Sequence, residues 1–118
     1  MKVIIAGSRS IMDYKTLELA IEASAIHNNF GITEVVSGGA SGIDSLGELW
    51  AMDNGVEVRR FPAYWNLYGK SAGIRRNIQM GDYADALIAV WDGQSRGTKQ
   101  MIDYARKKDL IVFVYEVK

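Results

Sequence analysis

The chain has 118 residues, 48% hydrophobic and 24% charged, which fits one globular domain spanning residues 1–118. Fourteen basic residues balance fourteen acidic ones, so no overall field draws the protein toward nucleic acid or a membrane. No apolar run reaches the ~18 residues of a membrane span, and the lack of cysteine excludes disulfides and thiolate metal sites. We therefore expect a cytoplasmic domain with no membrane partner.

The first half of the chain predicts two strands and two helices. Residues 3–6 form a continuous apolar run, as expected for a strand buried on both faces of a parallel sheet. Apolar residues then recur at helical spacing over 17–24, with Asp13 as the expected N-cap. A second strand is expected at 34–36. The helix after it carries an apolar stripe of Ile43, Leu46, Leu49 and Trp50 and should end near Asn54 and Gly55.

The second half continues this alternation. Strands are expected at 56–61, 86–91 and 110–117, and helices at 72–83 and around 101–105. Met101, Ile102 and Ala105 should face the core, and only 62–69 reads as a long irregular stretch. Five strands alternating with four helices predict a doubly wound, three-layer α/β sandwich with a five-stranded parallel sheet, for which we expect the strand order 3-2-1-4-5.

Ligands bind such sheets outside the carboxyl ends of the strands, close to where the strand order reverses. The loop after the first strand reads Gly7-Ser8-Arg9-Ser10. Glycine there permits close backbone approach, and Arg9 offers a fork of donors for phosphate. An ordinary turn explains this short loop equally well.

The loop after the second strand carries a stronger signal for an anionic ligand. It reads Ser37-Gly38-Gly39-Ala40-Ser41-Gly42-Ile43-Asp44 and leads directly into a helix. Small residues at a helix N-terminus leave N–H groups and a favourable dipole for an anion. The alternative is a tight turn with Asp44 as a first-turn capping carboxylate, but such a turn needs fewer glycines. The Lys of a Walker loop and the G-x-G-x-x-G spacing are both missing, so neither motif applies.

A second loop of the same design follows the fourth strand, reading Trp91-Asp92-Gly93-Gln94-Ser95-Arg96-Gly97-Thr98. In the expected strand order, the second and fourth strands flank the first. The two small-residue loops should therefore face each other across one crevice.

Other polar and aromatic residues allow two interpretations each. Arg75 is expected on a solvated face, whereas Arg76 and Asn77 lie either over the crevice or in solvent. The aromatic residues of the irregular stretch either stack on a base or cover the core. His27 is expected on the surface, and no group of residues has metal-ligand spacing. We therefore expect neither a metal nor a cofactor. The aromatic residues are Tyr64, Trp65 and Tyr68.

These motifs, in this order, resemble the SLOG superfamily, which joins the DprA/Smf and LOG proteins, and in particular its small phage-type YspA/YpsA-related branch. The resemblance covers nearly the whole chain. Gly7-Ser8-Arg9 and residues 37–45 resemble two DprA motifs, and Ser95-x-Gly97-Thr98 resembles a second phosphate loop. Segments resembling the small branch itself contain Lys70, Arg76, Asn77 and Met80.

The resemblance implies a nucleotide-binding Rossmann-like fold that forms homodimers or larger homo-oligomers. LOG enzymes cleave the N-glycosidic bond of nucleoside monophosphates, and Arg76 and Met80 match their Arg-x-x-x-Met pattern. The position of their catalytic Glu holds Met101, and a thioether can act neither as a base nor as a stabilising charge. DprA proteins bind single-stranded DNA, which calls for a basic groove that a neutral charge balance does not favour.

We therefore expect a binding or sensing domain for a small nucleotide or nucleotide-derived phosphate ligand. One alternative is a LOG-like phosphoribohydrolase with Arg76, Asp92 and Asp44 as candidate catalytic residues; another is a DprA-like module for single-stranded DNA. The expected ligand-binding residues are Gly7, Ser8, Arg9, Ser37, Gly38, Gly39, Ala40, Gly42, Asp44, Lys70, Arg76, Asn77, Ser95, Gly97 and Thr98.

Overall fold

The computed structural model describes residues 1–24 and 31–117, and the part described contains one five-stranded sheet. Its strands are β1 (Lys2–Gly7), β2 (Glu34–Ser37), β3 (Glu57–Arg60), β4 (Ala86–Trp91) and β5 (Ile111–Glu116). All neighbouring strands are parallel, and their order is β3-β2-β1-β4-β5. The predicted topology is therefore confirmed.

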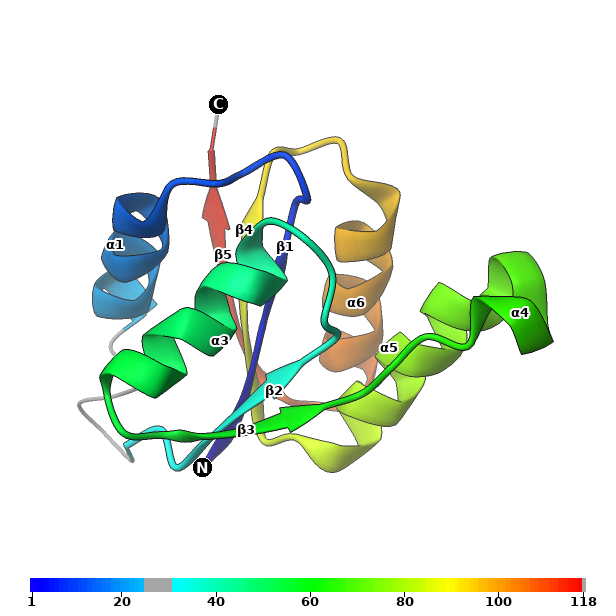
Figure 1. Cartoon of the computed structure of the whole chain (residues 1–118), viewed down its shortest axis with the longest axis horizontal. Coiled ribbons are helices and arrows are strands. Elements are labelled where there is room, and N and C mark those ends of the chain that lie inside the picture. The colour runs from blue at the N-terminus through cyan, green and yellow to red at the C-terminus, as the bar shows by residue number, and fades with distance from the viewer. Residues whose placement is uncertain (25–30, 118) are drawn as a thin grey trace.

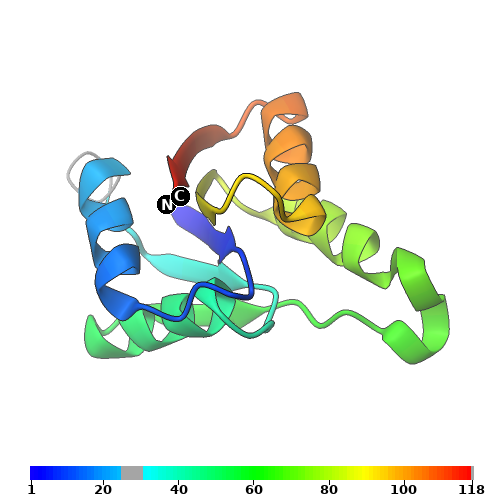
Figure 2. The same ribbon diagram turned by 90° about the horizontal axis from the view of Figure 1, so that it is seen from above.

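Helices cover both faces of this sheet and complete the three layers (Figure 1). The helical elements are α1 (Tyr14–Ser24), α3 (Ile43–Asp53), α4 (Trp65–Tyr68), the 3-10 turn η1 (Gly69–Ser71), α5 (Ala72–Tyr83) and α6 (Arg96–Lys107). Viewed from above, α1 and α3 lie on one side of the sheet, and α5 and α6 lie on the other (Figure 2). None of the helices in the described residues is long and apolar enough to cross a membrane.

The alternation of side chains along β1 divides the core between the two helical layers. Val3 and Ile5 belong to the cluster that packs against α1 and α3, whereas Ile4 and Ala6 belong to the cluster against α5 and α6. Successive strand residues point to opposite faces, so a strand covered on both sides must be apolar throughout. The continuous apolar run in the sequence thus encodes the central position of β1.

The α3 helix differs from the predicted apolar stripe. Only Leu49 departs from it, with 43% of its surface exposed. Ile43 is buried as predicted, and Leu46 and Trp50 pack partly buried against the core. Gly47 and Ala51 are also buried. A Cβ at Gly47 would lie 2.7 Å from Ile5 Cγ2. The missing side chain at Gly47 therefore lets the helix approach β1 closely, and this contact turns Leu49 outward.

The segment 62–69, expected to be irregular, contains the single-turn helix α4, which projects away from the sheet (Figure 1). Its aromatic side chains do not cover the core, because Tyr64, Trp65 and Tyr68 are 57%, 49% and 41% exposed. The core-covering interpretation of these residues is therefore wrong. The expectation for His27 lies outside the described residues.

Two loops at the carboxyl edge touch backbone to backbone. Gly42 has φ of 74°, and a Cβ there would lie 2.5 Å from the carbonyl oxygen of Arg9 and 2.6 Å from that of Ser8. Both the positive φ and the close approach require glycine. The β2–α3 loop is thereby held directly against the loop that follows β1.

Replacing Gly42 should therefore destabilise the fold more than replacing a glycine that only has a positive φ. Gly55 offers the matched control, because its φ is 67° and a Cβ there would meet nothing within 4 Å. Gly55→Ala should cost about 1–2 kcal/mol from the left-handed backbone alone. Gly42→Ala should cost a further ~1–3 kcal/mol, because its methyl group must push the two loops apart. Equal losses in urea unfolding would contradict the close approach.

Candidate functional site

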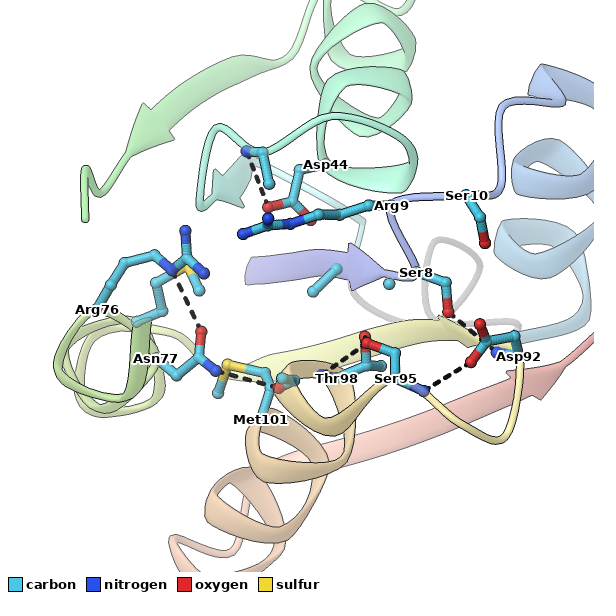
Figure 3. A pocket seen from close by; sticks show the side chains of 15 residues that line it. Ser8, Arg9, Ser10, Asp44, Arg76, Asn77, Asp92, Ser95, Thr98 and Met101 are labelled. Atoms are coloured by element: carbon cyan, nitrogen blue, oxygen red, sulfur yellow. Dashed lines mark hydrogen bonds between the residues drawn. The ribbon is translucent and has the colours of Figure 1, made fainter. Parts of the chain in front are cut away.

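A cavity of about 410 Å³ opens at the carboxyl ends of β1 and β4, between the N-terminal ends of α3 and α6 and the side of α5. We call it the main cavity; Figure 3 shows its side chains. It brings together predicted residues from four separate segments of the chain. They are Gly7, Ser8, Arg9, Ala40, Asp44, Arg76, Asn77, Asp92, Ser95, Gly97 and Thr98.

Five predicted ligand-binding residues do not line the main cavity. Ser37 is fully buried, and its Oγ donates to Glu48 Oε2 at 2.6 Å. Gly42 packs beneath the β1 loop, and Lys70 is exposed on η1 away from the cavity. Gly38 and Gly39 line a neighbouring second cavity of about 360 Å³.

Ser8 connects the loops that follow β1 and β4. This side chain is only 1% exposed; its Oγ accepts a hydrogen bond from Asp92 N at 3.1 Å, and its own N–H donates to Val90 O at 3.1 Å. A buried hydroxyl needs such partners. Ser8 therefore links the two loops at the wall of the main cavity.

Arg76 lies over the cavity, which decides between the two interpretations of this residue. Its Nη1 donates to Gly38 O at 3.0 Å, and its Nε donates to Asn77 Oδ1 at 3.3 Å. Arg9 and Arg76 extend toward one another from the β1 loop and from α5 (Figure 3). Burial lowers the pKa of Arg76, the Asp44 carboxylate opposes this effect, and the charge of Arg9 adds to it. Two guanidinium groups therefore face a shared space.

Asn77 positions Arg76 and has little capacity left for a ligand. Its side chain is 5% exposed, and its Nδ2 donates to Gly97 O at 3.2 Å and to Gln100 Oε1 at 2.6 Å. Its Oδ1 accepts from Arg76. Both amide protons thus have partners, and Asn77 joins α5 to the start of α6.

Asp44 is a carboxylate buried in the cavity wall, with 5% exposure. Burial raises its pKa from 3.8 to about 6, against the lowering effects of the Ala40 N–H, which donates to Oδ2 at 3.3 Å, and of Arg76. A Cβ at Gly38 would lie 2.9 Å from both Asp44 Oδ2 and Arg76 Nη1. The absence of a side chain at Gly38 therefore leaves room for both charged groups.

The loop after β4 is held mainly by its own side chains. Asp92 Oδ1 accepts from the N–H groups of Gln94 and Ser95, both at 2.8 Å, and these bonds lower the pKa of Asp92. Ser95 caps α6 by accepting from Thr98 N at 3.4 Å. Asp92 is therefore committed to the loop, as a low-pKa acceptor.

Some backbone N–H groups remain available to an anion at each loop. In the described part of the chain, those of Arg96 and Gly97 at the start of α6, and that of Ser41 before α3, donate to no protein atom. Those of Gly39 and Ala40 donate instead to Ser37 Oγ and Asp44. A phosphate at these helix ends would meet fewer donors than the glycine count suggested.

Arg60 was missed by the sequence prediction, and Ser10 was not among the expected ligand-binding residues although its loop was singled out. Ser10 lines the main cavity, and Arg60 lines the second cavity from the carboxyl end of β3. The rule that ligands lie beyond the carboxyl ends of parallel strands would have found Arg60, had it been applied to the third strand. Within residues 1–24 and 31–117, no three His, Asp or Glu side chains form a group that could hold a metal ion.

Residues 1–68 match the family described as the YspA, cpYpsA-related SLOG family. The chain belongs to this family. It is also similar to the Gene 61 protein of Mycobacterium phage D29, with 34% identity over 117 residues that cover 94% of this chain and 93% of the phage protein.

The fold is also that of a solved SLOG protein. The structure of DNA processing protein A (DprA) from Streptococcus pneumoniae superposes with a TM-score of 0.74 over 99% of this chain, at 17% identity. This chain spans only 50% of that DprA chain. The likeness establishes the shared five-stranded architecture.

The raised pKa of Asp44 predicts a specific dependence of stability on pH. The folded state binds this proton more tightly than the unfolded state, so the free energy of unfolding falls as pH rises from about 4 through about 6. Above that range the ionised carboxylate should cost about 3 kcal/mol in total. Asp44→Asn removes the titration and keeps an acceptor oxygen for Ala40.

Between about pH 4.5 and about pH 7.5, the wild type should therefore lose about 2 kcal/mol more stability than Asp44→Asn. Chemical denaturation at a series of pH values measures this difference. Parallel curves for the two proteins would show that Asp44 titrates normally.

Proposed function

We propose that the protein binds a small nucleotide-like ligand in the main cavity, with a phosphate group held near Arg9 and Arg76. The observation that carries this proposal is the pair of guanidinium groups facing one space at the carboxyl edge of the sheet. Guanidinium groups recognise phosphate through paired, charge-assisted hydrogen bonds. The free N–H groups at the start of α6 would add donors to the same anion.

The rest of the main cavity suits the polar remainder of such a ligand. Ser10, Ser95 and Thr98 place hydroxyl groups along its wall, and the buried Asp44 offers an acceptor for a sugar hydroxyl. Met80 and Met101 form an apolar part of the lining. A volume of about 410 Å³ lies within the usual range for small-molecule sites.

Hydrolysis of a nucleoside monophosphate is the second candidate function. Met101 is 1% exposed and lies in the cavity lining and the core, where it supplies no charge. The observation that favours catalysis is Asp44, whose pKa of about 6 suits an acid or base near neutral pH. Asp92 is the weaker candidate, since its carboxylate is held by backbone N–H groups.

Binding of single-stranded DNA and self-association remain predictions from the family resemblance. The likeness to DprA concerns the fold alone and covers half of that chain. Arg9 and Arg76 share the main cavity with Asp44 and Asp92, which gives this cavity a balanced charge rather than a basic character. That balance favours a compact ligand over a polyanion.

Nucleotides should stabilise the protein and nucleosides should not. At about a hundredfold excess over Kd, a ligand adds about 2.7 kcal/mol to the free energy of unfolding. We expect an adenine or guanine monophosphate to raise the melting temperature, and the matching nucleoside to raise it far less. Equal shifts in melting temperature for nucleotide and nucleoside would show that the phosphate group does not contribute to binding.

Arg76→Ala should weaken nucleotide binding by about 1.5–3 kcal/mol, because it removes a charge-assisted hydrogen bond to phosphate. Arg75→Ala serves as its control, because Arg75 is exposed on the same helix.

The wild-type protein should release little or no free base from nucleoside monophosphates, because Met101 occupies the position of the LOG carboxylate. Incubation with each monophosphate, followed by chromatography for free base, measures this directly. Robust release that is lost in Asp44→Asn would instead establish the hydrolase and assign Asp44 to it.

A further inference from the structure

We propose that the ligand carries a second phosphate group, as in a nucleoside diphosphate, and that this group enters the second cavity beside Arg60. This inference rests on the proposed function, because it extends the same site. The second cavity measures about 360 Å³ and shares Arg9, Ala40 and Arg76 with the main cavity. The two cavities are therefore neighbours, and a ligand held by Arg9 and Arg76 in the first has the second directly beside it.

The two cavities differ in charge. The main cavity is lined by two arginines and two aspartates, whereas the lining of the second contains Arg9, Arg60 and Arg76 and no carboxylate. The guanidinium groups shared by the cavities lie at their junction, and Arg60 lies beyond it. This arrangement matches a ligand whose negative charge continues past its first phosphate.

The wall of the second cavity also permits close approach by an anion. Gly38, Gly39 and Ser41 line it through the β2–α3 loop, and the Ser41 N–H donates to no atom of the described residues. Glycines leave the backbone open to a ligand, and a free N–H at this loop adds a donor. The diphosphate would thus meet backbone and guanidinium donors together.

Arg60 is paired with Glu48, which does not line the second cavity. Its Nε donates to Glu48 Oε2 at 3.1 Å, its Nη2 contacts Glu48 Oε1, and Ser37 Oγ donates to the same carboxylate. The Arg60 side chain is nevertheless 63% exposed, so part of the guanidinium remains free for a ligand. Glu48 therefore orients Arg60 and moderates its charge.

The test compares adenosine and guanosine diphosphates with the matching monophosphates by isothermal titration calorimetry. The wild type should bind one diphosphate more tightly than its monophosphate. Arg60→Gln should lower the ratio of diphosphate to monophosphate affinity about fivefold to tenfold, as for a partly exposed charge-assisted contact. Arg59→Gln is the matched control on the same strand, since Arg59 stacks over Phe61 and Tyr83 and does not line the cavity. This control should leave the ratio unchanged.

Two further outcomes separate the explanations. Glu48→Gln should raise the ratio, because the amide still accepts a hydrogen bond from Arg60 but no longer offsets its charge. A fall matching that of Arg60→Gln would show that Arg60 acts through its ion pair with Glu48 and not on the ligand, and would overturn the second subsite. Monophosphate binding with no preference for diphosphate would overturn the second subsite and leave the proposed function standing. No binding of any nucleotide would overturn the proposed function itself. If an oligothymidylate bound more tightly than the diphosphate, and this binding also depended on Arg60, the diphosphate proposal would be overturned in favour of single-stranded DNA.

Discussion

Backbone contact between the β1 loop and the β2–α3 loop sets the geometry of the whole carboxyl edge. Gly42 lies so close to the carbonyl groups of Ser8 and Arg9 that no side chain fits between them. On its other side, Ser8 accepts the N–H of Asp92 and so fixes the loop after β4. Three segments far apart in sequence are thereby held around one cavity by the contacts of Gly42 and Ser8.

The same edge holds two charged groups in surroundings that disfavour their charged forms. Asp44 is buried beside the cavity with a raised pKa, and Arg76 is partly desolvated with a lowered pKa. Gly38 has no side chain, which leaves room for both groups beside it. Both shifts represent stability given up in the folded state, and such shifts concentrate at functional sites. A phosphate near Arg9 and Arg76 would relieve the repulsion between the two cations.

The alternating pattern of strands and helices was sufficient to predict the fold. Continuous apolar runs identified β1 and β4 as central strands, and small-residue loops located the carboxyl edge. The error at α3 arose because Leu49 follows a helical spacing that Gly47 overrides by close packing against Ile5. The spacing of apolar residues indicates which face of a helix is apolar, but it does not indicate how closely that helix packs against a strand.

The candidate site was predictable in outline only. The glycine loops indicated where a ligand would lie, whereas the internal partners of Ser37, Asn77 and Asp92 depend on side-chain geometry that no local pattern reveals. Lys70 belongs to a segment that resembles the family, yet its side chain is exposed on η1. Arg60 sits in an exposed edge strand, where a charged residue is ordinary, so its role emerges only from its neighbours across the β2–α3 loop.

The central claim is that a phosphate-bearing ligand occupies the carboxyl edge between these loops. Backbone amide chemical shifts, followed by nuclear magnetic resonance during titration with a nucleoside phosphate, test it most directly. The largest changes should fall on residues 8–10, 38–44 and 95–98, together with Arg76. Changes confined to the opposite edge of the sheet, or to α1 alone, would contradict the account.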